Sequence, residues 1–591
     1  MTRTAPTDVL RVDLSAKRVD RERVPEEWRR RYVGGKGLGA RFLYEELDAG
    51  VDPLGPENAL AFVLGPLTGY LPGEPRYAAV TKSPLTGAFL DSYSGGSFPG
   101  RLAGALDGAL CVLVTGRADE PVVVEVADGT ASVEPAGDLE GADAVETDAA
   151  FPDAAVACVG PAGESEVAYA TIASDGGDHH AGRGGAGAVM GSKNLKALVA
   201  RGDPPEGLAA LREEYAARYR EGDVGRWQSA GETVESVDFA NEVGALATRG
   251  WQESQFEDAD DIGVEAVRRA AEGREREDDP VPGGFRVETE EGESVPRGAA
   301  SMTLGAGLGV DEFDAVATLG ATCDRLGMDV ISAGNAVAWA VRAADEGVVD
   351  SDVAFGEPES ARDLIREIAT RETPLADALA DGVERAATRL GDETTDALVP
   401  TVKSMALPSY DPRAAESMAL AYATSDRGGC HRRARPIERE VFAREGWDDD
   451  RRVEAVVHAQ DRRSVLWSLV ADDFAGVALH EDLGAEWLSA VGHPPPADDL
   501  RTVGERVWNL VRLFNAREGF TRDDDALPPA LEEPVADGPN EGAALDADHF
   551  ARLLDAYYAA RGWGERGLPT PATVERLGLG DVVDDQTPLD E

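Results

Sequence analysis

Three clusters of glycine are the first feature of the chain that could do chemistry. GGKGLG spans residues 34–39, SGGSFPG spans 94–100 and AGRGGAGAVMGSKNLKA spans 181–197. Glycine lets backbone N–H groups approach an anion closely, so such turns can hold phosphate groups. None follows the phosphate-binding pattern G-x4-G-K-[ST], and the glycines after Gly182 are misspaced for a dinucleotide-binding turn. Each cluster is therefore also compatible with an ordinary tight turn.

Four charged or titratable side chains are candidates for contacting a ligand. Arg76 lies in PRYAAVTKSP, Asp324 and Asp329 lie in DRLGMD, and His431 lies in GGCHRRA. A guanidinium suits a phosphate or the polar edge of a planar heterocycle. Each candidate also has a simpler interpretation: a surface ion pair for the arginine, helix capping for the aspartates and a structural role for the histidine. The residue types alone leave both interpretations open.

The chain has four cysteines, Cys111, Cys158, Cys323 and Cys430. No two of them show the C-x2-C spacing of a metal site, so the sequence supports neither a zinc ribbon nor a disulfide framework. Cys111 and Cys158 lie in apolar runs that resemble strands. We expect them to be buried small hydrophobic residues.

The composition is strongly acidic, with 111 acidic and 58 basic residues among 591 and a formal charge of −53. Such a charge repels the phosphates of nucleic acids and of anionic membrane surfaces. Hydrophobic residues make up 42% of the chain and recur periodically, which favours a folded protein over a disordered one. No apolar run approaches the roughly 20 residues that span a bilayer, and the N-terminus lacks an apolar signal core. The sequence predicts a cytoplasmic protein.

Lysine is rare, with only six lysines against 52 arginines. Acidic excess with few lysines is typical of proteins from a high-salt cytoplasm, where the Debye length falls to about 3 Å at 1 M salt and carboxylates can crowd the surface. An acidic protein from a GC-rich bacterium is the alternative.

The residues that could do chemistry must be positioned by two kinds of element. The first 200 residues are rich in glycine and short β-branched runs, which predicts strands, and from about Pro205 apolar residues recur at helical spacing. We predict an α+β fold with a β-rich N-terminal domain (1–205) followed by two mainly helical domains (206–411 and 412–591). Predicted strands are Ala59–Leu64, Tyr77–Thr81, Leu110–Thr115 and Pro121–Val126, and predicted helices are Leu38–Leu47, Asp311–Leu326, Ala333–Gly347, Thr502–Asn515 and Asp546–Arg561.

The order of the motifs is similar to that of the aldehyde ferredoxin oxidoreductase family from about residue 8 to residue 575. The similar segments are RVDLS, GGKGLGARFLYEEL, GPLTG, PRYAAVTKSPLTG, SGGSFPG, VGPAGE, AGRGGAGAVMGSKNLKA, CDRLGMDVISAGN, LPSYDPR, LAYATSDRGGCH, RVWNLVRLFN and DDDALPPALEEP. The resemblance implies tungsten or molybdenum held by the dithiolenes of two pterins, magnesium bridging the pterin phosphates, and a nearby [4Fe-4S] cluster. It implies oxidation of an aldehyde or oxo group to a carboxylic acid, with electrons passing to ferredoxin or another redox protein. It leaves a homodimer open.

The resemblance also assigns roles to particular residues. His431 matches the histidine near the metal and is the candidate catalytic residue. Tyr93 stands where family members often have asparagine, and we expect its backbone carbonyl to help hold the magnesium. No side chain is assigned as a protein ligand of the metal. The candidate cofactor-binding residues are Arg76, Tyr93, Gly95, Gly96, Arg183, Gly184, Gly185, Asp324 and Asp329.

The pattern fails at the iron–sulfur cluster. The family motif C-x2-C-x3-C aligns with Glu277, Pro280 and Gly284, and the fourth cysteine aligns with Ser468. Ser468 lies in the second copy of the family's pterin motif D-x-x-G-L-[CD], where Arg463 replaces the aspartate. Iron–sulfur clusters need thiolates, so we predict that no conventional cluster binds.

The pattern also fails at the residue that would activate water. The segment VPRGAA (295–300) lacks the glutamate that the family carries there, so the sequence offers no general base at this place. Two hypotheses follow. The chain is either a family enzyme with another exit for electrons, or a non-catalytic paralogue that binds pterin or acts as a scaffold.

The charge generates a first prediction. We expect the fold to persist in molar salt and to loosen at low salt, because the repulsion between surface carboxylates is then unscreened. Circular dichroism spectra of the purified protein at both salt levels test this. Identical spectra would count against adaptation to high salt.

Overall fold

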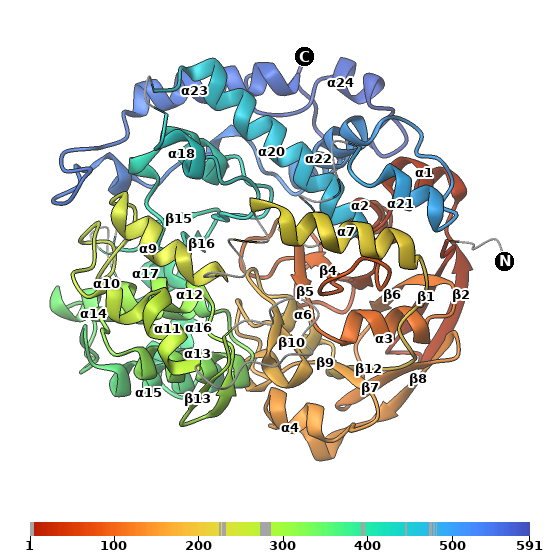
Figure 1. The fold of residues 1–591 in the computed structure, drawn as a ribbon, viewed down its shortest axis with the longest axis horizontal. Coiled ribbons are helices and arrows are strands. Elements are labelled where there is room, and N and C mark those ends of the chain that lie inside the picture. Colours follow the sequence, from red (N-terminus) through yellow and green to blue (C-terminus); the bar gives the residue numbers. More distant parts are fainter. Residues whose placement is uncertain are drawn as a thin grey trace.

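The computed structural model describes the chain except residues 1–4, 224–225, 227–231, 272–284, 392–394, 396–397, 444–445, 472–475, 477–478 and 480–481. Sheets fill the N-terminal third and helices dominate the rest, so the predicted α+β fold is confirmed (Figure 1). The domain boundaries at 205 and 411 stay a prediction. In the described residues, no helix is both long and apolar enough to cross a bilayer.

Two six-stranded sheets form the N-terminal region. The first has the order β2-β1-β6-β3-β4-β5 and the second the order β11-β10-β9-β12-β7-β8. Their apolar side chains share one core, and all four predicted strands are present. The strands are β1 (Asp8–Asp13), β2 (Arg18–Arg23), β3 (Leu60–Val63), β4 (Tyr77–Lys82), β5 (Phe89–Ser94), β6 (Ala109–Thr115), β7 (Val122–Ala127), β8 (Thr130–Pro135), β9 (Ala155–Cys158), β10 (Ile172–Ser174), β11 (His179–Ala181) and β12 (Leu195–Arg201).

Helices accompany the sheets and then form the remainder of the chain. Those of the N-terminal region are α1 (Glu26–Tyr32), α2 (Gly35–Glu46), α3 (Phe98–Ala105), α4 (Ala144–Ala149), α5 (Pro161–Glu164) and α6 (Ala186–Ser192). Those of the middle region are α7 (Ala209–Glu221), α9 (Glu235–Glu242), α10 (Ala259–Ile262), α11 (Val264–Ala271), α12 (Gly298–Ala300), α13 (Phe313–Leu326), α14 (Val330–Asp345), α15 (Pro358–Thr370), α16 (Pro374–Ala380) and α17 (Val383–Leu390).

The C-terminal region packs back onto the start of the chain. Its helices are α18 (Glu416–Ala423), α19 (Ile437–Glu440), α20 (Asp449–Leu469), α21 (Ala485–Ala490), α22 (Leu500–Arg517), α23 (Ala547–Arg561) and α24 (Pro571–Arg576). Two small hairpins, β13 (Val287–Thr289) with β14 (Gly292–Ser294) and β15 (Thr401–Val402) with β16 (Met405–Ala406), complete the fold. In Figure 1, α20 and α22 lie beside α2 at the top of the molecule.

The glycine cluster at residues 34–39 serves packing. The helix α2 begins at Gly35, earlier than the predicted Leu38, because its glycines let it approach α20 closely. A Cβ atom on Gly35 would lie 2.1 Å from the carbonyl oxygen of Trp467, and Gly35 has a left-handed φ of +36°. A Cβ atom on Gly37 would lie 2.3 Å from the carbonyl oxygen of Tyr32. This cluster therefore joins the N-terminal and C-terminal regions.

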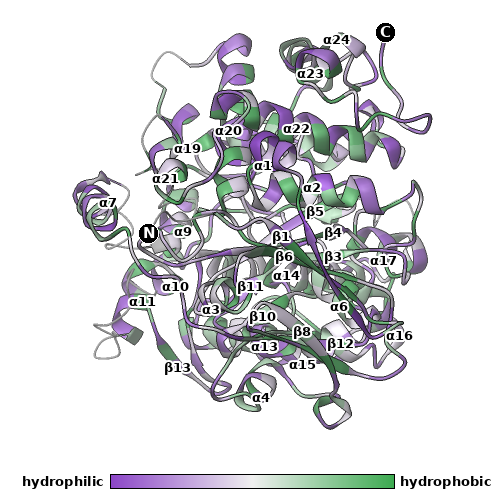
Figure 2. Ribbon diagram, turned by 90° about the vertical axis from the view of Figure 1, so that its right-hand side faces the viewer, coloured by the Kyte–Doolittle hydropathy of each residue, from purple (hydrophilic) through white to green (hydrophobic). Residues whose placement is uncertain are grey.

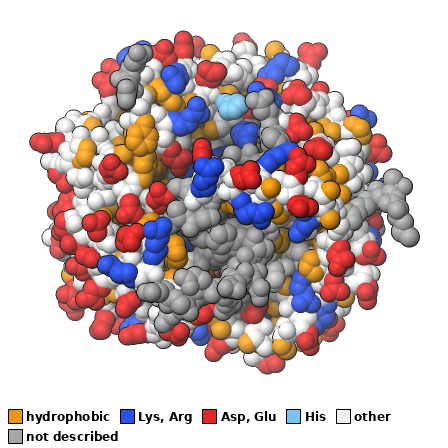
Figure 3. Space-filling model, viewed as in Figure 1, with side chains coloured by type: hydrophobic (Ala, Val, Ile, Leu, Met, Phe, Trp, Pro, Cys, Tyr) orange, Lys and Arg blue, Asp and Glu red, His pale blue; other side chains and the backbone are white. Residues whose placement is uncertain are grey.

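Apolar and charged residues separate as the composition requires. Figure 2 shows apolar residues along the central strands and polar residues along outer helices such as α7. Figure 3 shows acidic side chains spread over the rim of one face, while basic side chains gather nearer its centre. The surface is therefore acidic, but its charge is uneven.

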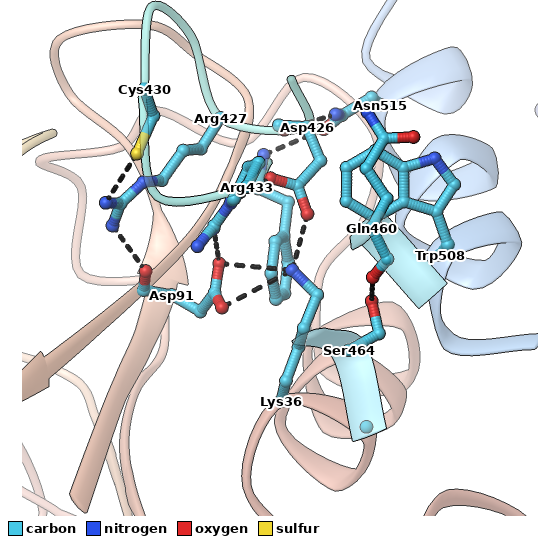
Figure 4. A network of polar contacts seen from close by, with 12 residues as sticks. Lys36, Asp91, Asp426, Arg427, Cys430, Arg433, Gln460, Ser464, Trp508 and Asn515 are labelled. Carbon is cyan, nitrogen blue, oxygen red and sulfur yellow. Dashed lines mark hydrogen bonds and ion pairs between the residues drawn. The ribbon is translucent and has the colours of Figure 1, made fainter. Parts of the chain in front are cut away.

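A buried ion network ties α2 and β5 to the loop that follows α18 (Figure 4). The Nζ atom of Lys36 bonds to a carboxylate oxygen of Asp426 and lies 3.3 Å from Asp91 Oδ2. Arg433 bonds to Asp91 and, through Nε, to Asp426 Oδ1 at 2.6 Å. Both cationic side chains are fully buried. Two cations thus face two carboxylates, and each charge has two partners of opposite sign.

The network generates a prediction about stability. Lys36→Met should lower the free energy of unfolding by about 3–5 kcal/mol, because it leaves buried carboxylates without one of their two cations. Lys17→Met is the matched control: its side chain is 51% exposed and lies 4.0 Å from Glu120, so we expect a change within about 0.5 kcal/mol. Urea unfolding at constant molar salt measures both. Equal midpoints for the two variants would contradict the role of the network.

Candidate functional site

A cavity of about 1600 Å³ collects side chains from all parts of the chain. Its lining includes eleven arginines and ten carboxylates, whereas the whole chain has almost twice as many acidic as basic residues. The cavity is therefore much less negative than the surface around it, which favours an anionic ligand. Eight of the ten predicted site residues line it: Arg76, Tyr93, Gly95, Gly96, Arg183, Asp324, Asp329 and His431.

Glu74 links Arg76 to the turn that follows β5. Arg76 Nη2 lies 2.7 Å from Glu74 Oε2, so the ion pair expected as the simpler interpretation is present, but inside the cavity. Glu74 Oε1 also accepts a hydrogen bond from the backbone N–H of Gly96 at 3.2 Å and lies 2.8 Å from His179 Nδ1. Burial acts to raise the pKa of Glu74, but Arg76 and His179 outweigh it and hold that pKa well below its usual range.

The glycines of this turn are required by close approaches. A Cβ atom on Gly95 would lie 2.3 Å from Glu74 Cδ. Gly96 has a left-handed φ of +82°, and a Cβ atom on it would lie 1.5 Å from Asp175 Oδ2. The turn is thus shaped so that backbone, rather than side chains, faces the cavity.

Tyr93 precedes this turn and points its ring toward α20. The ring stacks on Trp467 with centroids 5.5 Å apart and planes 27° apart. Its hydroxyl group donates a hydrogen bond to Asp91 Oδ2 at 2.6 Å. Burial and the neighbouring Asp91 raise the pKa of Tyr93 well above its usual value, so the phenol stays neutral.

Arg183 reaches across the cavity to the C-terminal region. Its Nη2 atom donates to the carbonyl oxygens of Ala406 at 2.5 Å and Gly429 at 3.2 Å, and its Nε atom lies 3.5 Å from Asp329 Oδ2. The two glycines that follow Arg183 serve packing. A Cβ atom on Gly184 would lie 2.7 Å from Leu90, and one on Gly185 would lie 2.2 Å from the carbonyl oxygen of Ala168. Neither glycine is among the described residues that line the cavity.

Asp324 and Asp329 lie on either side of the turn that joins α13 to α14. Asp329 caps α14, accepting a hydrogen bond from Ser332 N at 2.9 Å. The simpler interpretation of this residue as a helix cap is therefore confirmed, although the residue also lines the cavity. Asp324 Oδ1 lies 3.3 Å from His180 Nε2. The carboxyl group of Asp324 faces the cavity rather than bulk solvent, and this burial raises its pKa to about 8. Burial lowers the pKa of His180 to about 4.

The loop after α18 brings His431 and Cys430 to the cavity region. Burial, reinforced by neighbouring arginines, lowers the pKa of His431 well below its usual value, so the imidazole is neutral. Cys430 Sγ accepts a hydrogen bond from Arg427 Nη2 at 3.0 Å (Figure 4). Burial acts to raise the pKa of Cys430, but Arg427, Arg433 and Arg183 outweigh it and lower that pKa to about 7.

Unpartnered nitrogen atoms test whether the cavity fits a polar cofactor. Among the described residues, four cavity-lining side chains carry a buried nitrogen with no hydrogen-bond partner: Arg183 (Nη1), Arg427 (Nε), His431 (Nδ1) and Arg433 (Nη1). A buried polar atom left unsatisfied costs about 1–3 kcal/mol. Four in one cavity indicate a large ligand with many acceptors, as a phosphorylated pterin offers, so these residues fit such a group.

Of the four positions that align with the cluster cysteines, only Ser468 lies in the described part of the chain. Glu277, Pro280 and Gly284 lie outside the described residues. Ser468 Oγ is buried, donates to the carbonyl oxygen of Ser464 at 2.7 Å and accepts from Gly37 N at 3.2 Å. Within the part of the chain that the structure describes, no group of three or more His, Cys, Asp or Glu side chains could hold a metal ion.

Two further features of the cavity were not assigned from the sequence. Glu74 and His179 join Arg76, and Arg427 and Arg433 dominate the C-terminal side. The signal for the second pair was the run of basic residues around GGCHRRAR, within which the sequence singled out only the histidine. The segment 295–300, where the family glutamate is missing, does line the cavity.

This fold and cavity define a class of protein in which a β-rich region and helical regions together line one large, arginine-rich cavity. The model of the N-terminal domain of aldehyde ferredoxin oxidoreductase matches residues 9–202, and the model of domains 2 and 3 matches residues 210–579. The chain belongs to the aldehyde ferredoxin oxidoreductase family. The resemblance predicted from the motifs is thereby confirmed.

Relatives share the whole length of the chain. It is 33% identical to the tungsten-containing aldehyde ferredoxin oxidoreductases of Pyrococcus abyssi and Pyrococcus horikoshii, covering 97% of this chain and 99% of each relative. It is 26% identical to the WOR-like subunit of an aliphatic sulfonate oxidoreductase of Pyrococcus furiosus, covering 97% of both. Among solved structures, the active-site complex BamBC of benzoyl coenzyme A reductase with 1,5-dienoyl-CoA shares the fold, with a TM-score of 0.82, 22% identity and 98% coverage of both chains.

The environment of Cys430 generates a prediction. Its folded pKa of about 7 lies below that of an unfolded thiol, so the thiolate stabilises the fold at alkaline pH and this contribution is lost as the pH falls through about 7. The difference in ultraviolet thiolate absorbance between the wild type and Cys430→Ser should show a step near neutral pH. Cys158→Ser is the control, because burial raises the pKa of Cys158 to about 12. A step near neutral pH in the absorbance difference for both variants, or for neither, would show that the arginines do not stabilise a thiolate.

Proposed function

We propose that the chain is an oxidoreductase that converts an aldehyde or oxo group of a small molecule to a carboxylic acid at a tungstopterin centre. The observation that carries the proposal is the set of buried, unpartnered nitrogen atoms on Arg183, Arg427, His431 and Arg433, four residues that line one cavity in a chain of this family. Relatives at 33% identity are named as tungsten-containing aldehyde ferredoxin oxidoreductases, which supports the metal and the substrate class.

The reaction sets what the cofactor and the residues must do. An aldehyde and a water molecule give a carboxylic acid with the release of two electrons and two protons. A bound tungstopterin would supply the two-electron acceptor. The chain would hold it through Arg76, Arg183, Asp324 and Asp329 and through the backbone of the turn at 94–97. Coordination of magnesium by the carbonyl group of Tyr93 belongs to the same proposal.

His431 is the residue that we assign to catalysis. Its imidazole is neutral because burial and nearby arginines disfavour the charged form. Its Nδ1 atom has no partner among the described residues and the side chain lines the cavity. A neutral ring nitrogen in this place can accept a hydrogen bond from water or orient the carbonyl group of a substrate. It would take part of the role of the missing glutamate.

Electrons must leave without a conventional cluster. We propose that a ferredoxin or another redox protein accepts them, in line with the names of the relatives. None of the comparisons favours the alternative of a non-catalytic, pterin-binding or scaffold paralogue, which becomes an outcome of the experiment below. Homodimer formation stays open.

We propose that the protein works in a cytoplasm of high salt concentration. Five of the six lysine side chains are buried and serve internal bonds: Lys36, Lys82, Lys193, Lys196 and Lys403. Lys196, for example, pairs with Glu164 at 2.5 Å. The surface therefore carries even fewer lysines than the composition of the whole chain implies, which supports adaptation to high salt.

Activity and metal content test the function together. Protein purified without oxygen from its host should contain tungsten or molybdenum, less than the roughly four irons per chain of a cluster, and should reduce a viologen dye when an aldehyde is added. His431→Phe should keep the metal but lose roughly 100-fold or more in rate. Metal without aldehyde-dependent reduction would favour the non-catalytic alternative. The absence of both metal and activity would contradict the proposal.

A further inference from the structure

The motif LPSYDPR (residues 407–413) brings an aromatic ring to a part of the cavity that the cofactor contacts above do not use. Its backbone is held by the chain that follows α9, since Asp411 N donates a hydrogen bond to the carbonyl oxygen of Ala245 at 2.8 Å. This arrangement places the ring of Tyr410 beside that of Phe239 on α9, with the two ring centroids 6.3 Å apart. Both side chains line the cavity.

Phe442 adds a third ring at the rim of the cavity. Its ring centroid lies 5.8 Å from that of Phe239, and its side chain is 66% exposed. Among the described residues, Val145 is the other large hydrophobic side chain that is exposed, and it does not line the cavity. An exposed aromatic side chain that continues a buried aromatic wall is typical of a ligand-binding groove.

A turn of π-helix, Ser301–Gly305, extends this wall further into the molecule. Ser236 Oγ, one helical turn before Phe239 on α9, lies 3.7 Å from Met302 Sδ. The helices α9 and α12, which lead to these residues, lie side by side (Figure 1). Met302 and Thr303 both line the cavity. Turns of π-helix frequently occur at functional sites.

Thr303 carries a hydroxyl group that a ligand would satisfy. Its side chain is 2% exposed, and its Oγ1 atom has no hydrogen-bond partner among the described residues. Burying a hydroxyl group without a partner is unfavourable, so this position indicates a ligand with a hydrogen-bonding atom. We call Phe239, Met302, Thr303, Tyr410 and Phe442 the aromatic pocket.

The charges next to the aromatic pocket do not favour an anion. Arg435 Nε lies 3.3 Å from Glu438 Oε1, so the two charges of this pair offset each other. Glu235 adds a carboxylate in the first turn of α9, and it also lines the cavity. An aldehyde that carries a carboxylate or a phosphate group gains little from these neighbours, whereas an uncharged ring can pack against the aromatic side chains.

Arg435 connects the aromatic pocket to the residue that we assign to catalysis. Burial is the main cause of the lowered pKa of His431 and of the raised pKa of Tyr410, and the charge of Arg435 acts on both groups. His431 and Tyr410 therefore lie on either side of one cation and line the same cavity. A molecule in the aromatic pocket is thus close to the imidazole.

We propose that the aromatic pocket binds the substrate, and that this substrate is an uncharged aldehyde with an aromatic group. A pocket for one drug-sized ligand has a volume of about 300–1,000 Å³, whereas the cavity has about 1600 Å³ and so has room for a cofactor and a substrate. The inference rests on the proposed function, because it names the class of aldehyde that the same site oxidises.

The choice among three aldehydes tests the substrate class. Protein purified without oxygen from its host is given benzaldehyde, acetaldehyde or succinic semialdehyde, and the reduction of a viologen dye is followed. We expect kcat/KM for benzaldehyde to exceed both other values at least roughly 10-fold, because only benzaldehyde carries a ring for the pocket. A kcat/KM for succinic semialdehyde equal to or above that for benzaldehyde would overturn the inference.

Two exposed hydrophobic residues provide a matched pair of variants. Phe442→Ala should lower the preference for benzaldehyde over acetaldehyde several-fold, whereas Val145→Ala, which lies outside the cavity lining, should leave it unchanged. Phe239→Ala should lower the preference further. Because Phe442 lies at the surface, its variant decides the question if circular dichroism shows that Phe239→Ala is not folded. The same preference in Phe442→Ala and Val145→Ala would overturn the assignment.

A binding measurement separates this inference from the proposed function. Radiolabelled benzyl alcohol, which is not an aldehyde, is dialysed to equilibrium against the wild type and against Phe442→Ala. Saturable binding that weakens several-fold in Phe442→Ala, without turnover of any aldehyde, would support the aromatic pocket and contradict the proposed function. Oxidation of acetaldehyde without saturable binding of benzyl alcohol would overturn the inference and leave the proposed function intact.

Discussion

The buried pairing of Lys36 and Arg433 with Asp91 and Asp426 is the interaction on which the rest of the structure depends. Desolvating a charge costs several kcal/mol even in real proteins, so each of these groups is tolerated only because the others are in place. Two of the four groups come from the N-terminal region and two from the loop after α18. Closing the network therefore brings that loop against β5, and the same loop carries His431 into the wall of the cavity. The same ion network therefore determines both the stability of the fold and the position of His431 in the cavity wall.

The cavity stands out because the chain around it is so acidic. A surface with a net charge of −53 repels anions, yet arginines outnumber carboxylates in the lining of the cavity. Some of those arginines are held by backbone carbonyls and by a thiol, as Arg183 is by Ala406 and Arg427 by Cys430, so their charge is not fully compensated by carboxylates. We propose that an anionic ligand completes this arrangement. Membership of the aldehyde ferredoxin oxidoreductase family supports a phosphorylated pterin as that ligand.

Much of the fold could be predicted because periodicity and turn residues act locally. The strand at Tyr77–Thr81 and the helix at Asp546–Arg561 were each located to within a residue or two. Motif resemblance also located eight of the residues that line the cavity, because residues such as Arg76 and Arg183 lie in distinctive segments. It failed where function depends on partners distant in sequence. The glycine-rich turn at 34–39, which could have bound phosphate, is instead a contact with α20. Lys36 pairs with Asp426 only because the fold brings the loop after α18 against α2.

We propose that the arginine-lined cavity holds a metal–pterin centre without an iron–sulfur cluster beside it. Anomalous diffraction from crystals of the anaerobically purified protein, collected at the tungsten and iron absorption edges, tests it most directly. We expect a tungsten peak in the cavity near His431 and no iron peak in or beside it. A compact iron peak next to α20, or a cavity with no heavy atom at all, would contradict it.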